Sequence, residues 1–71
     1  MNIQLKPMRL IFERHDDTWD KVVTDLNGNI IFEQRGIVLF PEHINKEYFD
    51  NWEAQLKSLP TLNIVEVERF I

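Results

Sequence analysis

The residues with the chemistry for metal binding are few and poorly spaced for it. The candidate ligands are His15 with Asp16 and Asp17, and the adjacent pair Glu42 and His43. Neither group has the spacing of a known metal motif, such as two histidines four apart on a helix or a calcium loop with its glycine and final glutamate. Side chains that follow one another in a turn rarely converge on one ion. We therefore expect no metal site.

Catalysis also lacks its usual residues. The chain has no cysteine, and its single serine, Ser58, follows a predicted helix instead of standing on a strand-to-helix turn. The two glycines, Gly28 and Gly36, are too few for a phosphate-binding loop. Paired carboxylates can do acid–base chemistry, but a chain of 71 residues has little room for a substrate pocket of roughly 300 Å3 or more. We expect a protein that is not an enzyme and needs no cofactor.

Length and composition describe one small domain, residues 1–71. Without cysteine it has no disulfide or thiolate zinc site, so its stability must come from packing or from a partner. The net charge of −4 disfavours contact with nucleic acid and with anionic membranes. No apolar run approaches the roughly 18 residues of a membrane span, and the N-terminus does not resemble a signal peptide. We expect a cytoplasmic protein.

Residues 18–34 are expected to form a β-hairpin. Asn27-Gly28 stands between two strand-like runs, and this dipeptide is the strongest short-range hairpin signal because both turn residues must accept a positive φ. A two-residue turn at this place sets the register of the two strands. The expected pairs are Val23 with Phe32, Val22 with Glu33, Thr24 with Ile31, and Asp20 with Arg35, the last as an ion pair.

A second turn at residues 15–18 adds a strand over residues 8–14. Pairing Phe12 with Lys21 and Leu10 with Val23 gathers the large apolar side chains on one face of the sheet. These side chains are Leu10, Phe12, Trp19, Val23, Ile30 and Phe32. A slip by one residue scatters them over both faces and leaves several unburied, at about 1.5–3 kcal/mol each. The sequence therefore predicts the first register.

The second half of the chain predicts one helix and one or two strands. The apolar run 37–40 is expected to be a separate strand or a bulged extension of the third strand at Gly36. Asn45 is expected to cap a helix that ends near Ser58, and residues 62–71 form a last strand. The apolar stripe of the helix is Tyr48, Phe49, Trp52, Leu56 and Leu59, with ion pairs Lys46–Asp50 and Glu53–Lys57. The fold class is α+β: a mostly antiparallel sheet of four to five strands, β-β-β-(β)-α-β, with one helix on one face.

A single helix covers one face of a sheet, so the opposite face is the candidate contact surface. In the predicted register this face carries Ile11, Val22 and Ile31, edged by Arg9, Glu13, Asp20, Glu33 and Arg35. An apolar strip with a charged rim is typical of a surface that binds a protein or a second copy of the chain. Alternatively, the last strand or residues 37–40 fold over the strip. The first interpretation predicts a small regulatory module that acts by stoichiometric binding or by homodimerisation.

Two other functions are considered. Acidic residues gather at the first hairpin tip and on the helix: Asp16, Asp17, Glu47, Asp50 and Glu53. They either form an ordinary solvated surface or imitate nucleic acid, as in an inhibitor of phage or mobile-element type that blocks a nucleic-acid-binding protein. Direct binding of nucleic acid would use Phe12, Trp19 and Phe32 as a stacking platform. The basic residues near them, Arg14 and Lys21, are too few for a phosphate groove.

Overall fold

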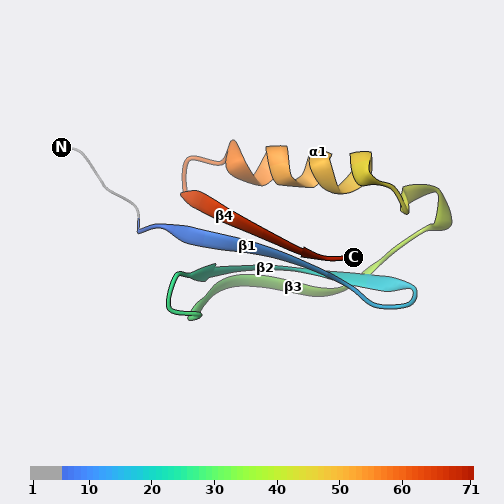
Figure 1. Ribbon diagram of the computed structural model, residues 1–71, viewed down its shortest axis with the longest axis horizontal. Coiled ribbons are helices and arrows are strands. Elements are labelled where there is room, and N and C mark those ends of the chain that lie inside the picture. The colour runs from blue at the N-terminus through green and yellow to red at the C-terminus, as the bar shows by residue number, and fades with distance from the viewer. Residues whose placement is uncertain (1–5) are drawn as a thin grey trace.

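The computed structural model describes residues 6–71, which form a four-stranded sheet with one α-helix (Figure 1). The elements are β1 (Met8–Arg14), β2 (Thr18–Asp25), β3 (Ile30–Val38), a 3-10 turn η1 (Pro41–His43), α1 (Lys46–Lys57) and β4 (Ile64–Phe70). The order of strands in the sheet is β3-β2-β1-β4. β1–β2 and β2–β3 are antiparallel, whereas β1–β4 is parallel. The α+β class is confirmed, and the sheet is mixed.

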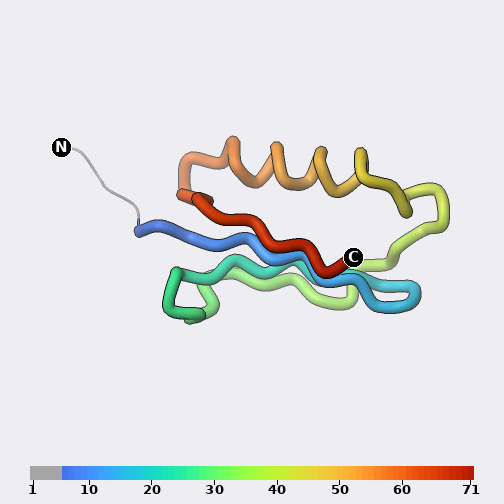
Figure 2. Tube along the Cα trace, viewed as in Figure 1, coloured from blue at the N-terminus to red at the C-terminus, as the bar shows by residue number. Residues whose placement is uncertain are grey.

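The two edge strands, β3 and β4, are joined by a connection that carries the helix over one face of the sheet. Figures 1 and 2 both place α1 along this face, with β4 next to it and β3 at the side of the sheet farthest from it. β4 lies within the sheet beside β1, and Ile37 and Val38 belong to β3. Neither segment folds over the opposite face, so residues 6–71 leave that face open.

The core lies between α1 and the sheet and is built on Trp19. Its indole is fully buried, and its centroid is 5.6 Å from the ring of Phe12, 5.3 Å from Phe49 and 5.8 Å from Trp52. Leu10, Phe12 and Val23 are also fully buried. The predicted register of β1 and β2 is confirmed, because Phe12 pairs with Lys21 and Leu10 with Val23. The Phe12 and Phe49 rings meet Trp19 edge to face, and such contacts stabilise a core beyond the area they bury.

The β2–β3 turn differs from the prediction by one residue. Asp25 closes a three-residue loop, Leu26–Gly28: its amide donates to the Asn29 carbonyl at 2.9 Å, and its carboxylate accepts the amides of Asn27 and Asn29. Gly28 has a φ of 91°, which only glycine adopts without strain. The loop is longer than the expected two-residue turn, so the β3 register changes at its start.

A register shift in β3 compensates for that longer loop. Thr24 pairs with Ile30, whereas Ile31 was the expected partner, but Val23–Phe32 and Val22–Glu33 pair as predicted. Because of this shift, Ile30 does not join the core as expected and is 55% exposed. Phe32 keeps its predicted partner Val23 but lies on an edge strand and is 43% exposed, so it too is outside the buried core. The extra residue thus gives β3 an exposed apolar start and leaves the rest of its predicted register intact.

The third strand continues through Gly36, where a second register shift occurs. Lys21 pairs with Gln34 and Trp19 with Ile37, so Arg35 and Gly36 stand together opposite Asp20. Gly36 has a φ of 70°, as is common for a glycine in a β-bulge. The run 37–40 is therefore the bulged extension of β3, which ends at Val38, and not a fifth strand.

The helix begins and ends where its sequence predicts. The Asn45 side chain accepts the amide of Tyr48 at 2.8 Å as the N-cap, and Ser58 is the C-cap. Both predicted ion pairs of the helix, Lys46–Asp50 and Glu53–Lys57, form at 3.1 Å. Arg69 of β4 adds bonds to Asp50 and Glu53 at 2.8 and 3.1 Å. These bonds fix α1 above the β4 side of the sheet.

Candidate protein-binding surface

The open face of the sheet exposes less apolar area than the sequence suggested. Ile11 and Val22 are cross-strand neighbours as expected, but Ile11 is half-buried and Val22 is only 7% exposed. The neighbour of Val22 on β3 is Glu33, and Ile31 lies beyond it at the register shift. The three predicted residues are therefore on adjacent strands, and Ile31 is the one that is widely accessible, at 47%.

The charged rim of this face is largely paired with itself. Arg9 forms an ion pair with Glu66 of β4 at 2.9 Å and lies 3.8 Å from Glu68. Glu33 and Arg35, two residues apart on β3, form a pair at 2.8 Å. Arg9 and Arg35, the two basic residues of the rim, therefore already have acidic partners on this face.

Asp20 is the most enclosed charged side chain on this face. Its carboxylate is 7% exposed and lies 3.0 Å from His15 Nε2 and 3.3 Å from Arg35 Nη1, and it accepts the amide of Gly36 at 2.9 Å. The His15 bond, the Gly36 bond and the two nearby cations lower the pKa of Asp20, and the same bond raises the pKa of His15. The predicted Asp20–Arg35 ion pair is confirmed, and this cluster holds the β3 bulge in place.

The largest run of accessible apolar side chains is at the start of β3. Ile30, Ile31 and Phe32 are consecutive and all exposed, and Leu26 in the adjoining loop is exposed as well. Every residue of β3 except Ile37 is exposed. Three consecutive exposed apolar residues on an edge strand are unusual outside binding sites, because such a strand is a template for another chain.

An apolar pocket adjoins this run on the helix side of the sheet. It has a volume of about 230 Å3 and is lined by Phe32, Leu56, Leu59, Thr61 and Leu62. Phe32 and Leu59 at its mouth are both exposed, whereas Leu56 is buried. This pocket was not expected from the sequence, because the predicted register places Phe32 in the core. We call Leu26, Ile30, Ile31, Phe32 and Leu59 the β3 patch.

The acidic residues proposed as a nucleic-acid mimic do not form one uncompensated surface. Asp16 and Asp17 are exposed at the β1–β2 turn, and Glu47 is exposed in the first turn of α1. Asp50 bonds Lys46 and Arg69, and Glu53 bonds Lys57 and Arg69. Since cations compensate both of these helix carboxylates, the field that such mimicry needs is weakened.

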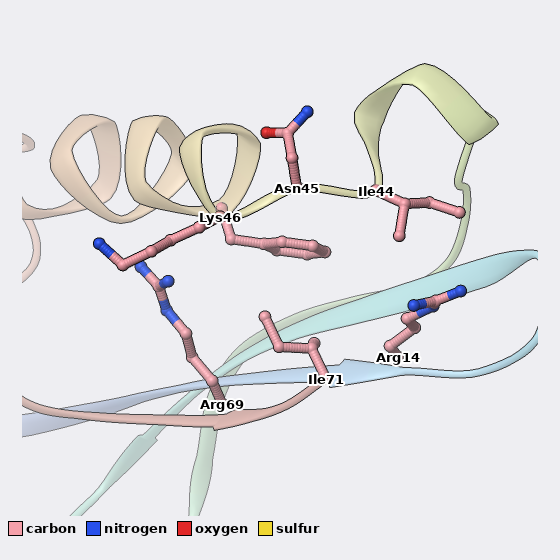
Figure 3. Close-up of a pocket in the computed structure, with 7 residues that line it drawn as sticks. Arg14, Ile44, Asn45, Lys46, Arg69 and Ile71 are labelled. Atoms are coloured by element: carbon pink, nitrogen blue, oxygen red, sulfur yellow. The ribbon is translucent and has the colours of Figure 1, made fainter.

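A second pocket, also of about 230 Å3, lies between the start of α1 and the end of β4 (Figure 3). It brings together Arg14, Lys46 and Arg69, a set of cations from three elements that the sequence analysis did not assemble. Figure 3 shows the Lys46 and Arg69 groups close to each other and the Arg14 group at the other end of the pocket. Lys46 and Arg69 also bond Asp50, so these two cations already have a carboxylate partner, and Arg14 stands apart from them.

The other chemical candidates have structural roles. Residues 6–71 contain no cluster of three His, Asp or Glu side chains that could hold a metal ion. His43 stacks on Tyr48 at 4.6 Å, and the Ser58 hydroxyl donates to the Gln55 carbonyl at 2.6 Å. Phe12 and Trp19 are fully buried under the helix and so are inaccessible to bases.

Within the described part of the chain, no helix is both long and apolar enough to span a bilayer. Comparisons with protein-family models, with curated proteins and with solved structures gave no match to this chain.

Proposed function

We propose that this protein is a non-catalytic interaction module that binds another protein chain at β3, by adding a strand to this edge of the sheet. One observation carries the proposal: Ile30, Ile31 and Phe32 are consecutive, exposed and on an edge strand. Strand addition supplies backbone hydrogen bonds, and side-chain pockets beside the edge supply selectivity. The apolar pocket at Phe32 is such a recess on one side of β3.

The open face contributes to this contact at its β3 border. Ile31 stands beside the paired charges Glu33 and Arg35, which gives an accessible apolar group with a polar rim. Ile11 and Val22 are too covered to be the main contact and act mainly as support beneath it. The contact surface proposed from the sequence is therefore narrowed to its β3 side.

A matched pair of substitutions tests this proposal. Ile31→Lys places a charge in the β3 patch, and Val65→Lys places the same charge on the other edge strand, where Val65 is 56% exposed. We expect tagged wild type and Val65→Lys to capture the same proteins from native lysate, also at high salt, because the contact is apolar. Ile31→Lys, shown to be folded by circular dichroism, should lose them. Identical capture by Ile31→Lys and wild type would refute the proposal.

A further inference from the structure

The order of residues along β3 is complementary to itself in the antiparallel direction. We propose that a second copy of this chain pairs β3 with β3 across a two-fold axis at Gln34, which joins the two four-stranded sheets into one continuous sheet. This inference rests on the proposed function, since it names the strand that is added to β3. The axis stands perpendicular to the sheet, so both helices lie on the same side of the joined sheet.

Charge selects this register. With the axis at Gln34, Glu33 of each copy stands opposite Arg35 of the other, and both side chains are on the open face, as their bonds to each other and to Asp20 show. Opposite charges at facing positions of an antiparallel pair are stabilising, and like charges are destabilising. The complementary pair occurs twice because the axis repeats it.

The neighbouring registers are unfavourable for two reasons. Facing residues in an antiparallel pair share a face, so a shift that moves the partner by one residue would oppose side chains from different faces. The next allowed axes pass through Glu33 or through Arg35, and they place two glutamates or two arginines opposite each other. Only the axis at Gln34 opposes unlike charges.

The apolar residues agree with this register. Beyond the bulge, Ile30 of one copy meets Val38 of the other; both are exposed, and both lie opposite open-face residues of β2, Thr24 and Thr18. Phe32 stands opposite Gly36, and an aromatic ring that covers a cross-strand glycine is a known stabilising device in sheets. The axis falls at Gln34, the last residue of β3 before the bulge at Arg35 and Gly36.

The other edge of the sheet repels its own copy. β4 carries Glu66 and Glu68, which lie two residues apart on the open face beside β1. An antiparallel self-pairing centred on residue 66, 67 or 68 opposes glutamate to glutamate. The two edges thus differ: β3 is complementary to itself, and β4 is protected against self-pairing by charge. A closed dimer follows, with no free β3 edge from which a fibre could grow.

Cross-linking tests the axis directly, because the chain contains no cysteine. Gln34→Cys puts two thiols opposite each other at the axis, within reach of a disulfide for facing residues. Val65→Cys puts a thiol on β4 as the matched control. Under mild oxidation at a protein concentration where light scattering shows a dimer, we expect Gln34→Cys to give a covalent dimer within minutes and Val65→Cys to give little.

Charge reversal gives an independent readout. Glu33→Arg sets two arginine side chains opposite each other at both symmetry-related positions, so the dissociation constant should rise roughly 30-fold. Glu47→Arg makes the same change in the exposed first turn of α1, away from both sheet edges, and should leave the dissociation constant unchanged. Circular dichroism checks that each variant is folded. If Glu33→Arg is unfolded, Glu33→Gln is measured in its place, and the dissociation constant should then rise roughly fivefold.

Three outcomes overturn the inference: a wild type that stays monomeric at millimolar concentration, a dimer whose Gln34→Cys variant cross-links no faster than Val65→Cys, or polymers that grow with concentration. All three leave the capture experiment with Ile31→Lys to decide the proposed function separately, because a different protein can still add its strand to β3.

Discussion

Replacement of the Asp20 carboxylate tests whether the cluster around the β3 bulge holds the fold. Asp20→Ala removes the bonds to His15, Arg35 and the Gly36 amide. Hydrogen bonds to a charged group contribute about 1.5–3 kcal/mol. The two side-chain donors are about half exposed, so water replaces part of the loss, and we expect about 1.5–2 kcal/mol for the whole carboxylate. The free energy of unfolding of a 71-residue domain is roughly 4–11 kcal/mol, so this loss is measurable without global unfolding.

Urea denaturation at pH 7 measures this loss. With a slope of about 1 kcal/mol/M for a small domain, the midpoint should fall by about 1.5–2 M. Glu13→Ala is the matched control, because Glu13 is the exposed partner of Asp20 in the β1–β2 register, and we expect it to stay within about 0.5 kcal/mol of wild type. If Asp20→Ala is no less stable than Glu13→Ala, the cluster does not stabilise the fold and the reasoning fails.

The same pair of titrating groups predicts the pH dependence. The pKa of Asp20 is lowered by the His15 and Gly36 bonds, so its contribution is complete above about pH 3.9 and is lost as the pH falls through the lower folded value. The pKa of His15 is raised by its bond to Asp20, so its contribution is complete below about pH 6.5 and is lost as the pH rises through the higher folded value. Asp20→Ala should remove both the loss of stability at acid pH and the loss at higher pH. His15→Ala should remove the loss at higher pH and weaken the loss at acid pH.

Three further predictions concern the core and the helix. Trp19→Ala should lower the free energy of unfolding by about 3–5 kcal/mol in thermal or urea unfolding, and Phe32→Ala should lower it clearly less, because Phe32 is 43% exposed. Equal losses would contradict the placement of Phe32 at the edge. Lys21 is buried with its ammonium 3.7 Å from the Trp52 ring, and burial lowers its pKa. The free energy of unfolding should therefore rise as the pH approaches about 10.4, and Lys21→Met should abolish this rise in urea titrations at pH 7 to 10. Asn45→Ala removes the N-cap and should cost about 1 kcal/mol in urea unfolding, and a loss below about 0.3 kcal/mol would show that the cap is not used.

Local signals in the sequence were sufficient for most of the fold. The Asn45 cap and the apolar periodicity placed α1, and the requirement that Leu10, Phe12 and Val23 share a face fixed the β1–β2 register. The prediction that was wrong is the type of the β2–β3 turn, which has three residues and not two. Asp25 was not recognised as a residue whose carboxylate closes a longer loop, although aspartate commonly bonds the backbone two residues on. A one-residue error in the loop moved Ile30 out of the core.

Contacts between distant segments were beyond the sequence. Nothing local indicates that β4 pairs with β1 in parallel, since this depends on the path of the helix over the sheet. The pocket at Phe32 has the same origin, because it forms where residues 56–62 pass near β3. The sequence therefore placed the accessible residue Ile31 on the open face, whereas the exposed run along β3 and the pocket beside it depend on the three-dimensional arrangement.

The exposure of β3 follows from the width of a single helix compared with that of a four-stranded sheet. A helix is about 10 Å wide and strands are about 4.8 Å apart, so one helix does not cover all four strands. The contacts of α1 fall on Phe12 of β1, Trp19 of β2 and Arg69 of β4. β3 is the strand with least cover, and it carries three consecutive apolar residues that a solvated edge would not need. A partner strand added to β3, as proposed, would cover these side chains and pair the free backbone groups of the edge.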